Sequence, residues 1–172
     1  MLNVKRIENL PCIKIGEGRS GCVYKISDRT VKKVYFNDTK PPAEYRMSKE
    51  IKVLETLKEF DNFPKIKAID EEKKVLYMSY VGVPIKEIKK SELPKNIIEQ
   101  VTNIINCLKI SKIFHHDLSI NHLMILKNKI YLIDFEKACI DKCHNQLDEN
   151  KTYKYKDMSY LLEIVKKYLK II

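Results

Sequence analysis

The sequence predicts an α+β protein with two lobes, a β-rich N-terminal lobe with one main helix and a mainly helical C-terminal lobe. Two observations predict it: short β-branched and aromatic segments fill most of the first 80 residues, and helical periodicity dominates the second half. Between them, residues 82–95 carry one glycine and two prolines, which is typical of a connector. We therefore expect a single domain over residues 1–172, with an N-lobe at about 1–80 and a C-lobe at about 83–172.

The N-lobe is predicted to contain five strands and one helix. Strands are expected where short β-branched or aromatic stretches stand between polar or glycine-bearing turns: residues 12–18, 22–27, 30–36, 63–70 and 73–81. A helix is expected over residues 41–60, which open with two prolines, because Met47, Ile51 and Leu54 recur at three- to four-residue spacing. The order is therefore strands, helix, strands.

The C-lobe is predicted to contain two helices around a small hairpin. Apolar residues form one face of a helix over residues 93–110. Two short strands follow, at 122–126 and 129–134, joined by a polar turn. The last predicted helix has an apolar stripe that runs from Met158 to Leu169.

The net charge of +10, from 33 Lys and Arg against 23 Asp and Glu, favours polyanionic partners such as nucleotide phosphates or nucleic acid. The lysines are spread along the chain, so a dedicated nucleic-acid site is only weakly supported. No apolar run approaches the ~20 residues that span a bilayer, and the start of the sequence does not resemble a signal peptide. An odd number of cysteines without regular spacing favours a reducing compartment, so we expect a cytoplasmic protein.

Residues 16–23, "GEGRSGCV", form a glycine-rich loop of the pattern Gly-x-Gly-x-x-Gly-x-Val. A strand is predicted directly after it, where a dinucleotide fingerprint would need a helix, so a β-hairpin is expected. Such a hairpin lets backbone N–H groups approach phosphates closely and closes over a nucleotide. Gly16, Gly18, Gly21 and Val23 are therefore candidates for nucleotide binding, and an ordinary turn is the structural alternative.

Lys32 and Lys33 lie in one predicted strand, and neighbouring residues of a strand face opposite ways. Only one of them can therefore point into a cleft beneath the hairpin. A two-residue turn before this strand would pair Lys32 with Lys25, which favours Lys32 as the phosphate ligand. A change of one residue in the loop would favour Lys33, so Lys32 is preferred with Lys33 left open.

Three acidic side chains complete the candidates. Glu50 lies in a predicted helix, where glutamate is usually solvated, but a charged lysine buried against phosphates needs an acidic partner on a rigid element. Asp117 and Asp134 each end a short apolar stretch and are seventeen positions apart. Taken alone, they are either a metal-binding pair at the bottom of a cleft or two solvated carboxylates at strand ends.

The order of these motifs resembles the protein-kinase-like superfamily over roughly residues 12–170. After the glycine loop, strand lysine and helix glutamate come "HHD" at 115–117 and "DFE" at 134–136, which are similar to the His-Arg-Asp and Asp-Phe-Gly motifs of kinases. The segment "YMSYVGVPI" resembles the hinge between kinase lobes, and this implies that backbone groups from Ser79 to Val81 meet an adenine. Several weak motifs in one order make a strong joint signal.

The resemblance also implies a role for each polar candidate in phosphoryl transfer from ATP. Lys32 would hold the α- and β-phosphates, with Glu50 positioning it, and Asp117 would accept or orient the proton of the attacking hydroxyl. Asp134 would hold Mg²⁺, with Mn²⁺ as the alternative, against the β- and γ-phosphates. His122 stands where kinases carry the asparagine of a second metal site, and since Mg²⁺ prefers oxygen, one metal or two stays open.

Two departures from the usual kinase residues, and the small number of residues after Asp134, make the sequence more similar to atypical kinases than to typical ones. His116 replaces an arginine that often binds a phosphorylated loop, and Glu136 replaces a glycine, as an extra metal neighbour or a solvent-facing group. Only about 38 residues follow Asp134, without the later helices that form a platform for peptide substrates. The sequence is in this respect similar to RIO and Bud-type kinases, lipopolysaccharide-core kinases and small effector kinases.

These motifs predict a minimal atypical kinase that transfers the γ-phosphoryl group of Mg-ATP to a Ser/Thr hydroxyl, with a protein as the expected acceptor. A small-molecule or sugar kinase is the alternative among enzymes, favoured by His122 and by the missing platform. A pseudokinase that binds ATP as a scaffold is the alternative from another class. The positive charge weakly favours action beside RNA.

Overall fold

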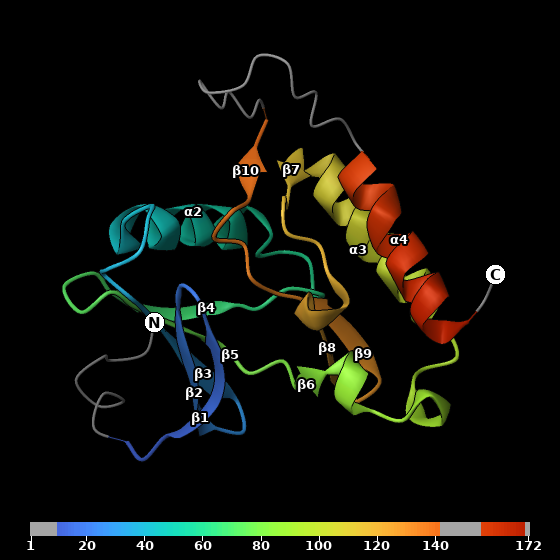
Figure 1. The fold of residues 1–172 in the computed structure, drawn as a ribbon, viewed down its shortest axis with the longest axis horizontal. Coiled ribbons are helices and arrows are strands. Elements are labelled where there is room, and N and C mark those ends of the chain that lie inside the picture. Colours follow the sequence, from blue (N-terminus) through green and yellow to red (C-terminus); the bar gives the residue numbers. More distant parts are fainter. Residues whose placement is uncertain (1–9, 142–155, 171–172) are drawn as a thin grey trace.

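The computed structural model describes residues 10–141 and 156–170, with side chains from residue 160 onward in the second segment. The side chain of Met158, in the predicted apolar stripe, lies outside the described residues. Figure 1 shows the strands β1 to β5 and helix α2 on one side of the molecule and helices α3 and α4 on the other. This arrangement confirms the predicted α+β fold with a β-rich N-lobe and a mainly helical C-lobe.

A five-stranded antiparallel sheet forms the N-lobe, with the strand order β1-β2-β3-β5-β4. Its strands are β1 (Ile13–Gly18), β2 (Gly21–Ser27), β3 (Thr30–Tyr35), β4 (Ile66–Asp70) and β5 (Val75–Ser79). The turns between the first three strands are too short for a crossover, so these strands can pair only antiparallel. Each strand overlaps a segment that the sequence predicts as a strand.

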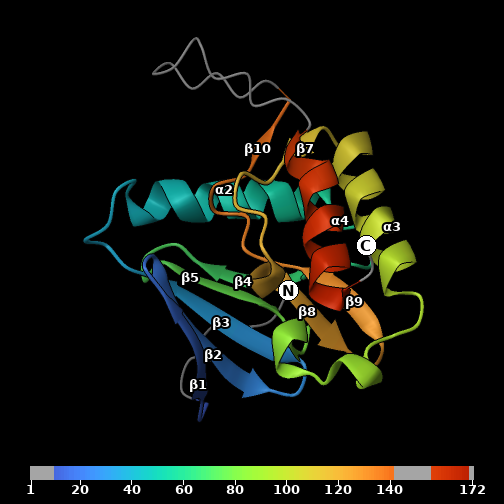
Figure 2. The same cartoon turned by 45° about the vertical axis from the view of Figure 1, so that its right-hand side comes forward.

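Helix α2 (Ala43–Thr56) covers one face of this sheet, as both views show (Figures 1 and 2). Met47 and Leu54 are almost fully buried and belong to the core beneath the helix. The same side carries Arg46 and Glu50, one turn apart, which are only 4% and 2% exposed. Charged side chains are buried this deeply almost only when they are paired, so this face of α2 marks an ionic site.

The connector between the lobes is held on its N-lobe side by backbone hydrogen bonds. The N–H of Ser79 donates to the carbonyl of Lys65 at 2.8 Å. The N–H of Tyr80 donates to the carbonyl of Arg29 at 3.2 Å. The end of β5 is therefore fixed to the N-lobe sheet and its neighbouring loops.

Gly82 holds the connector on the C-lobe side. Its φ is +94°, and a Cβ there would lie 1.8 Å from the carbonyl oxygen of Ile125, so only glycine fits. Directly after it, β6 (Val83–Pro84) pairs with β8 (Leu123–Leu126). Val81 thus lies between Tyr80, which is hydrogen-bonded to the N-lobe, and Gly82, which contacts the C-lobe.

The C-lobe is built around α3 (Ile97–Ile110) and α4 (Lys156–Leu169), which lie side by side in both views (Figures 1 and 2). The predicted apolar face of α3 is buried, with Val101 and Leu108 fully enclosed. Leu161 of α4 is enclosed as well. Among the described residues, no helix combines the length and the apolar character needed to cross a membrane.

Short elements complete the C-lobe, and most of them have no sequence signature, because two or three residues show no period. They are β6, β7 (Ile113–Phe114), β9 (Lys129–Leu132), β10 (Cys139–Ile140), η1 (Ile85–Glu87), η2 (Lys90–Glu92) and η3 (Ile120–His122). Strands β8 and β9 form the predicted hairpin, whereas the pairing of β7 with β10 was not predicted. Since β7 leads into residues 115–122 and β10 follows residues 134–138, their pairing brings these two loops together.

Replacing Gly82 with alanine is expected to destabilise the protein by at least about 2 kcal/mol, because the residue would be strained at positive φ and its methyl group would meet a backbone oxygen. Urea unfolding followed by circular dichroism measures this loss. Gly18→Ala is the matched control, since a Cβ at Gly18 meets nothing within 4 Å. Equal stability of the two variants would contradict the role given to Gly82.

Candidate nucleotide and metal site

A cleft of about 680 Å³ lies between the lobes. This volume is within the range of roughly 300–1,000 Å³ that is usual for small-molecule sites. The predicted site residues that line it are Gly16, Gly18, Gly21, Val23, Glu50, Ser79, Val81, Asp117, His122 and Asp134. The structure therefore brings together every predicted site residue except Lys32.

The glycine-rich loop forms the predicted β-hairpin, and it lies over the cleft. Its glycines differ in what requires them. A Cβ at Gly21 would lie 2.3 Å from the carbonyl oxygen of Val34, so close packing of β2 against β3 excludes any side chain there. At Gly18 nothing lies within 4 Å, and this open space lets a ligand approach the backbone.

Lys33 points into the cleft, and the prediction for Lys32 was wrong. The register of β2 and β3 shifts between Lys25 and Ser27, where β2 carries an irregularity. Lys25 is consequently opposite Val31 and not opposite Lys32. The extra residue exchanges the faces of the two lysines, as a β-bulge does.

Lys32 lies on the other face of the sheet. It is opposite Tyr24 on β2 and Tyr77 on β5, and its Nζ lies 5.5 Å from the centre of the Tyr24 ring. Tyr77 is in turn packed in a small apolar cluster on that face, away from α2. Lys32 therefore has no route to the cleft.

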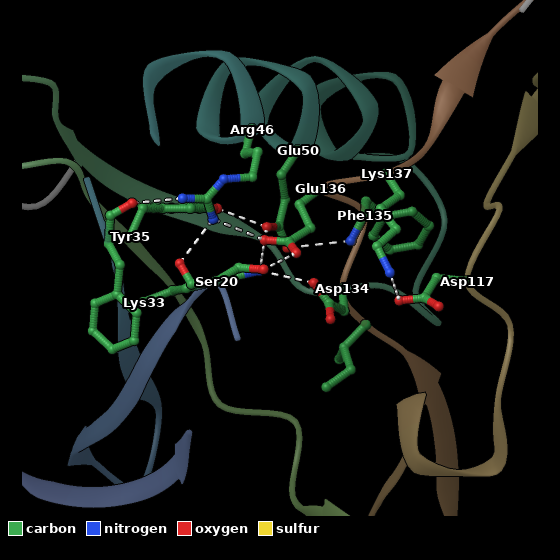
Figure 3. A network of polar contacts seen from close by, with 12 residues as sticks. Ser20, Lys33, Tyr35, Arg46, Glu50, Asp117, Asp134, Phe135, Glu136 and Lys137 are labelled. Carbon is green, nitrogen blue, oxygen red and sulfur yellow. Dashed lines mark hydrogen bonds and ion pairs between the residues drawn. The ribbon is translucent and has the colours of Figure 1, made fainter. Parts of the chain in front are cut away.

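Lys33 is the centre of the polar contacts at the base of the cleft (Figure 3). Its Nζ donates to Glu50 Oε2 at 2.7 Å and to Asp134 Oδ1 at 2.8 Å. Glu136 Oε2 lies 3.6 Å from the same Nζ. The hydroxyl of Tyr35 also donates to Glu50 Oε2, at 2.6 Å. Glu50 therefore pairs with a strand lysine as predicted, but that lysine is Lys33.

The neighbouring charges keep both members of the Lys33–Asp134 pair ionised. Burial lowers the pKa of Lys33, but Glu50 and the other anionic neighbours raise that pKa, and the net result lies well above the ordinary value. Burial raises the pKa of Asp134, but the charge and hydrogen bond of Lys33 lower that pKa, and the net result lies below the ordinary value. The base of the cleft thus holds a fixed cation beside a fixed anion at neutral pH.

The backbone around Asp134 is held in an unusual conformation. Asp134 has a φ of +68°, in the left-handed region that few non-glycine residues adopt. The next residue, Phe135, is fully buried, with its ring 5.9 Å from that of Phe63 and 4.8 Å from that of His115. Its N–H donates to Glu50 Oε1 at 3.4 Å. These contacts aim the Asp134 carboxylate into the cleft.

The loop after β7 presents Asp117 and His122 to the same space. His115, which is buried, donates from Nε2 to the carbonyl of Ile133 at 3.0 Å and accepts the N–H of Asp117 at Nδ1. His122 Nδ1 lies 2.6 Å from the carbonyl oxygen of Asp117, and since a carbonyl only accepts, this nitrogen carries the proton. The other ring nitrogen, Nε2, lies 3.6 Å from Asp134 Oδ2.

This donor set fits a divalent cation. One ligand atom from each of Asp117, His122 and Asp134 lies within 4.8 Å of the others. A histidine that donates its first ring nitrogen to a carbonyl and offers its second is the usual arrangement of a metal-binding histidine. The two carboxylates offer oxygen ligands, which suit both Mg²⁺ and Mn²⁺. The imidazole adds a nitrogen ligand, which Mn²⁺ accepts more readily than Mg²⁺ does.

Sequence reasoning missed Ser20, Tyr35, Arg46 and Lys137 as members of the site. The Nζ of Lys137 donates to Asp117 Oδ2 at 2.9 Å, although both side chains are partly exposed. An exposed pair of this kind is weak and exchanges readily with a ligand. Only Arg46 carries a signal in the sequence, because it precedes Glu50 by one helical turn and so shares its face.

The connector lines the cleft with Ser79 and Val81, as predicted. Ser79 is largely committed to the N-lobe, because its Oγ accepts the N–H of Lys65 at 2.9 Å and its own N–H donates to the Lys65 carbonyl. The N–H of Tyr80 is also engaged. The two backbone N–H groups that precede Val81 are thus bonded within the N-lobe.

Comparison with solved structures finds the Rio2 kinase from Chaetomium thermophilum in its ADP/Mg²⁺-phosphoaspartate complex, with a TM-score of 0.70 and 13% sequence identity. The match covers 97% of this chain and 57% of that chain, so this chain spans little more than half the length of that one. At this identity the match shows a shared protein-kinase-like fold. No curated protein matches the chain. The model of the RIO domain matches residues 23–169, from the glycine hairpin to the last helix, and the chain therefore belongs to the RIO family of atypical protein-kinase-like proteins.

Proposed function

We propose that the chain is an atypical kinase that uses Mg-ATP to phosphorylate a Ser/Thr hydroxyl, with a protein as the acceptor. The observation that carries this function is the position of Lys33, which bonds both Glu50 and Asp134 at the base of a cleft covered by a glycine hairpin. Phosphoryl transfer needs a cation on the phosphates, a metal site and an oriented nucleophile, and little other chemistry. Membership of the RIO family supports the same function.

In this proposal the cleft orients ATP along its length. The adenine lies against the connector at Val81, and the α- and β-phosphates lie between Lys33 and the backbone of the hairpin at Gly18. Asp134 and His122 would hold the divalent ion, which would neutralise charge on the β- and γ-phosphates. The Rio2 complex with ADP and Mg²⁺ supports this assignment by analogy of fold.

Asp117 is the proposed residue that receives the proton of the acceptor. The acceptor oxygen forms a bond to the γ-phosphorus while the bond to the β–γ bridging oxygen breaks, and that electron pair leaves on ADP. The hydroxyl proton passes to the carboxylate of Asp117. The weak pair of Asp117 with Lys137 is exchanged on substrate binding, which places the Lys137 ammonium near the transferred group.

Transfer to an aspartate of the chain itself is a second candidate. The Rio2 structure contains a phosphoaspartate, and here two aspartates, Asp117 and Asp134, lie in one cleft with their ligand atoms within 4.8 Å of each other. An acyl phosphate formed at either residue would then be hydrolysed, and the net reaction would be ATP hydrolysis.

Saturating Mg-ATP is expected to raise the melting temperature of the wild type by about 5–10 °C, since ligand at 100 times its Kd adds about 2.7 kcal/mol of stability. Lys33→Met removes the cation from the phosphates and is expected to abolish the shift, measured from the variant's own ligand-free melting temperature. Lys32→Met is the matched control, because its ammonium lies on the opposite face of the sheet. Loss of the shift in the Lys32 variant alone would contradict the register in the structure.

Asp117→Asn is expected to lower phosphate transfer by at least about 100-fold, because an amide takes up no proton, while the ATP-induced stabilisation remains. Transfer of radiolabelled γ-phosphate to a generic protein acceptor or to the chain itself measures the first effect. Label that is released by hydroxylamine would identify the aspartyl phosphate. If Mg-ATP stabilises the wild type but no phosphate is transferred, the result would favour a pseudokinase that binds ATP without turning it over.

His122→Asn is expected to shift the metal preference toward Mg²⁺ by at least about threefold, because an oxygen ligand replaces the imidazole nitrogen. Thermal shifts with ATP at a series of Mg²⁺ and Mn²⁺ concentrations measure the preference. ATP without metal provides the baseline for each protein. An unchanged preference would exclude His122 from the metal site.

A further inference from the structure

We propose that Glu136 is a positioning residue that, together with Arg46, fastens the glycine hairpin over the cleft by binding Ser20. We call Ser20, Arg46 and Glu136 the hairpin latch. Its contribution to ATP binding rests on the function proposed above, whereas the latch itself is present in the ligand-free chain. The alternatives for Glu136 that the sequence left open were a metal neighbour or a solvent-facing group.

The latch joins three elements that are far apart in the sequence (Figure 3). Ser20, in the turn of the hairpin, donates from Oγ to Glu136 Oε1 at 2.6 Å. Arg46 of α2 donates from Nη1 to the backbone carbonyl of Ser20 at 2.8 Å, and the same nitrogen lies 3.4 Å from Glu136 Oε2. The hairpin is thus bound through both its backbone and its side chain.

Burial makes this latch stronger than a surface contact. Glu136 is 6% exposed and Arg46 is 4% exposed, so neither charge can turn to water when a partner is lost. The hydrogen bond from Ser20 goes to an ionised carboxylate, and such bonds are roughly twice as strong as neutral ones. Glu136 is therefore a buried carboxylate with assigned partners, and a solvent-facing role is excluded.

Arg46 is itself held by the segment between β3 and α2. Its Nε donates to the carbonyl of Pro41 at 2.9 Å, and Nη2 donates to the carbonyl of Phe36 at 2.6 Å and to the hydroxyl of Thr39. A planar guanidinium can make all these bonds at once, and a lysine cannot. The latch is consequently anchored to the segment between β3 and α2, which does not line the cleft.

The latch also shares a partner with the phosphate site. Glu136 Oε2 lies 3.6 Å from the Nζ of Lys33, and Glu136 is only two residues from Asp134. On α2, Arg46 and Glu50 lie one turn apart, so one helix face serves both the latch and the lysine. Closure of the hairpin and placement of the phosphate-binding cation are therefore parts of one arrangement.

The consequence for binding is preorganisation. A glycine hairpin that moved freely would lose conformational entropy on closing over a nucleotide, and that loss would weaken binding. The latch holds the hairpin near its closed position before the nucleotide arrives. Loss of the latch should accordingly weaken ATP binding more than it slows the chemical step.

Amide hydrogen exchange without nucleotide tests the latch directly. Ser20→Ala removes one hydroxyl and leaves the backbone contacts, and it is expected to speed exchange over residues 16–21 about tenfold, by loss of a hydrogen bond to a charged group. Ser27→Ala is the matched control, because the hydroxyl of Ser27 accepts a hydrogen bond in an exposed turn of the same sheet. Ser20→Thr, which retains a hydroxyl, should restore slow exchange.

ATP kinetics test the positioning role. Ser20→Ala should raise KM for ATP about tenfold with a smaller change in kcat, since the lost bond acts before the transition state. In a Glu136→Ala background the same substitution should add nothing, because the partner is already gone. If Glu136→Ala fails to fold, Glu136→Gln keeps the shape and should show an intermediate effect.

The two proposals fail in different ways. Unchanged exchange over residues 16–21 in Ser20→Ala would overturn the latch, whether or not ATP binds. Faster exchange in a protein whose wild type shows no stabilisation by Mg-ATP would support the latch and refute the proposed kinase. A fall in kcat at constant KM would overturn the positioning role.

Discussion

The ion pairs of the buried Lys33 ammonium are the interactions on which the rest of the structure depends. Removing such a charge from water costs several kcal/mol unless well-placed partners compensate it. Here the compensation comes from two separate elements, α2 through Glu50 and the loop after β9 through Asp134 and Glu136. Because each element must be in place for the charge to be neutralised, the sheet, the helix and the loop fix one another's positions.

Most of the fold could be predicted from the sequence, because apolar residues recur with a clear period in its main elements. The glycines of the hairpin likewise stand at a recognisable spacing. The choice between Lys32 and Lys33 could not, since the irregularity between Lys25 and Ser27 leaves no mark in the sequence of a single chain. A one-residue bulge in β2 shifts the pairing register of β3, and a shift of one residue exchanges the faces on which the β3 side chains lie. The strand was therefore predicted correctly, whereas the lysine of that strand that lines the cleft was not.

The polar network around the motif was harder to predict than the motif itself. Glu136 was noticed only as a departure from a glycine, because its partners Ser20 and Arg46 lie 116 and 90 positions away in the sequence. Such pairings depend on the assembled fold and on no local pattern. Arg46 was within reach, since a residue one turn before Glu50 must share its helical face.

The connector has a consequence for how the two lobes can move. Tyr80 is hydrogen-bonded to the N-lobe, and Gly82 is pressed against the backbone of Ile125 in the C-lobe. The torsion angles available for a rigid-body rotation of the lobes are thus concentrated at Val81, which is itself buried. The relative position of the two lobes therefore depends mainly on the backbone conformation of this one residue.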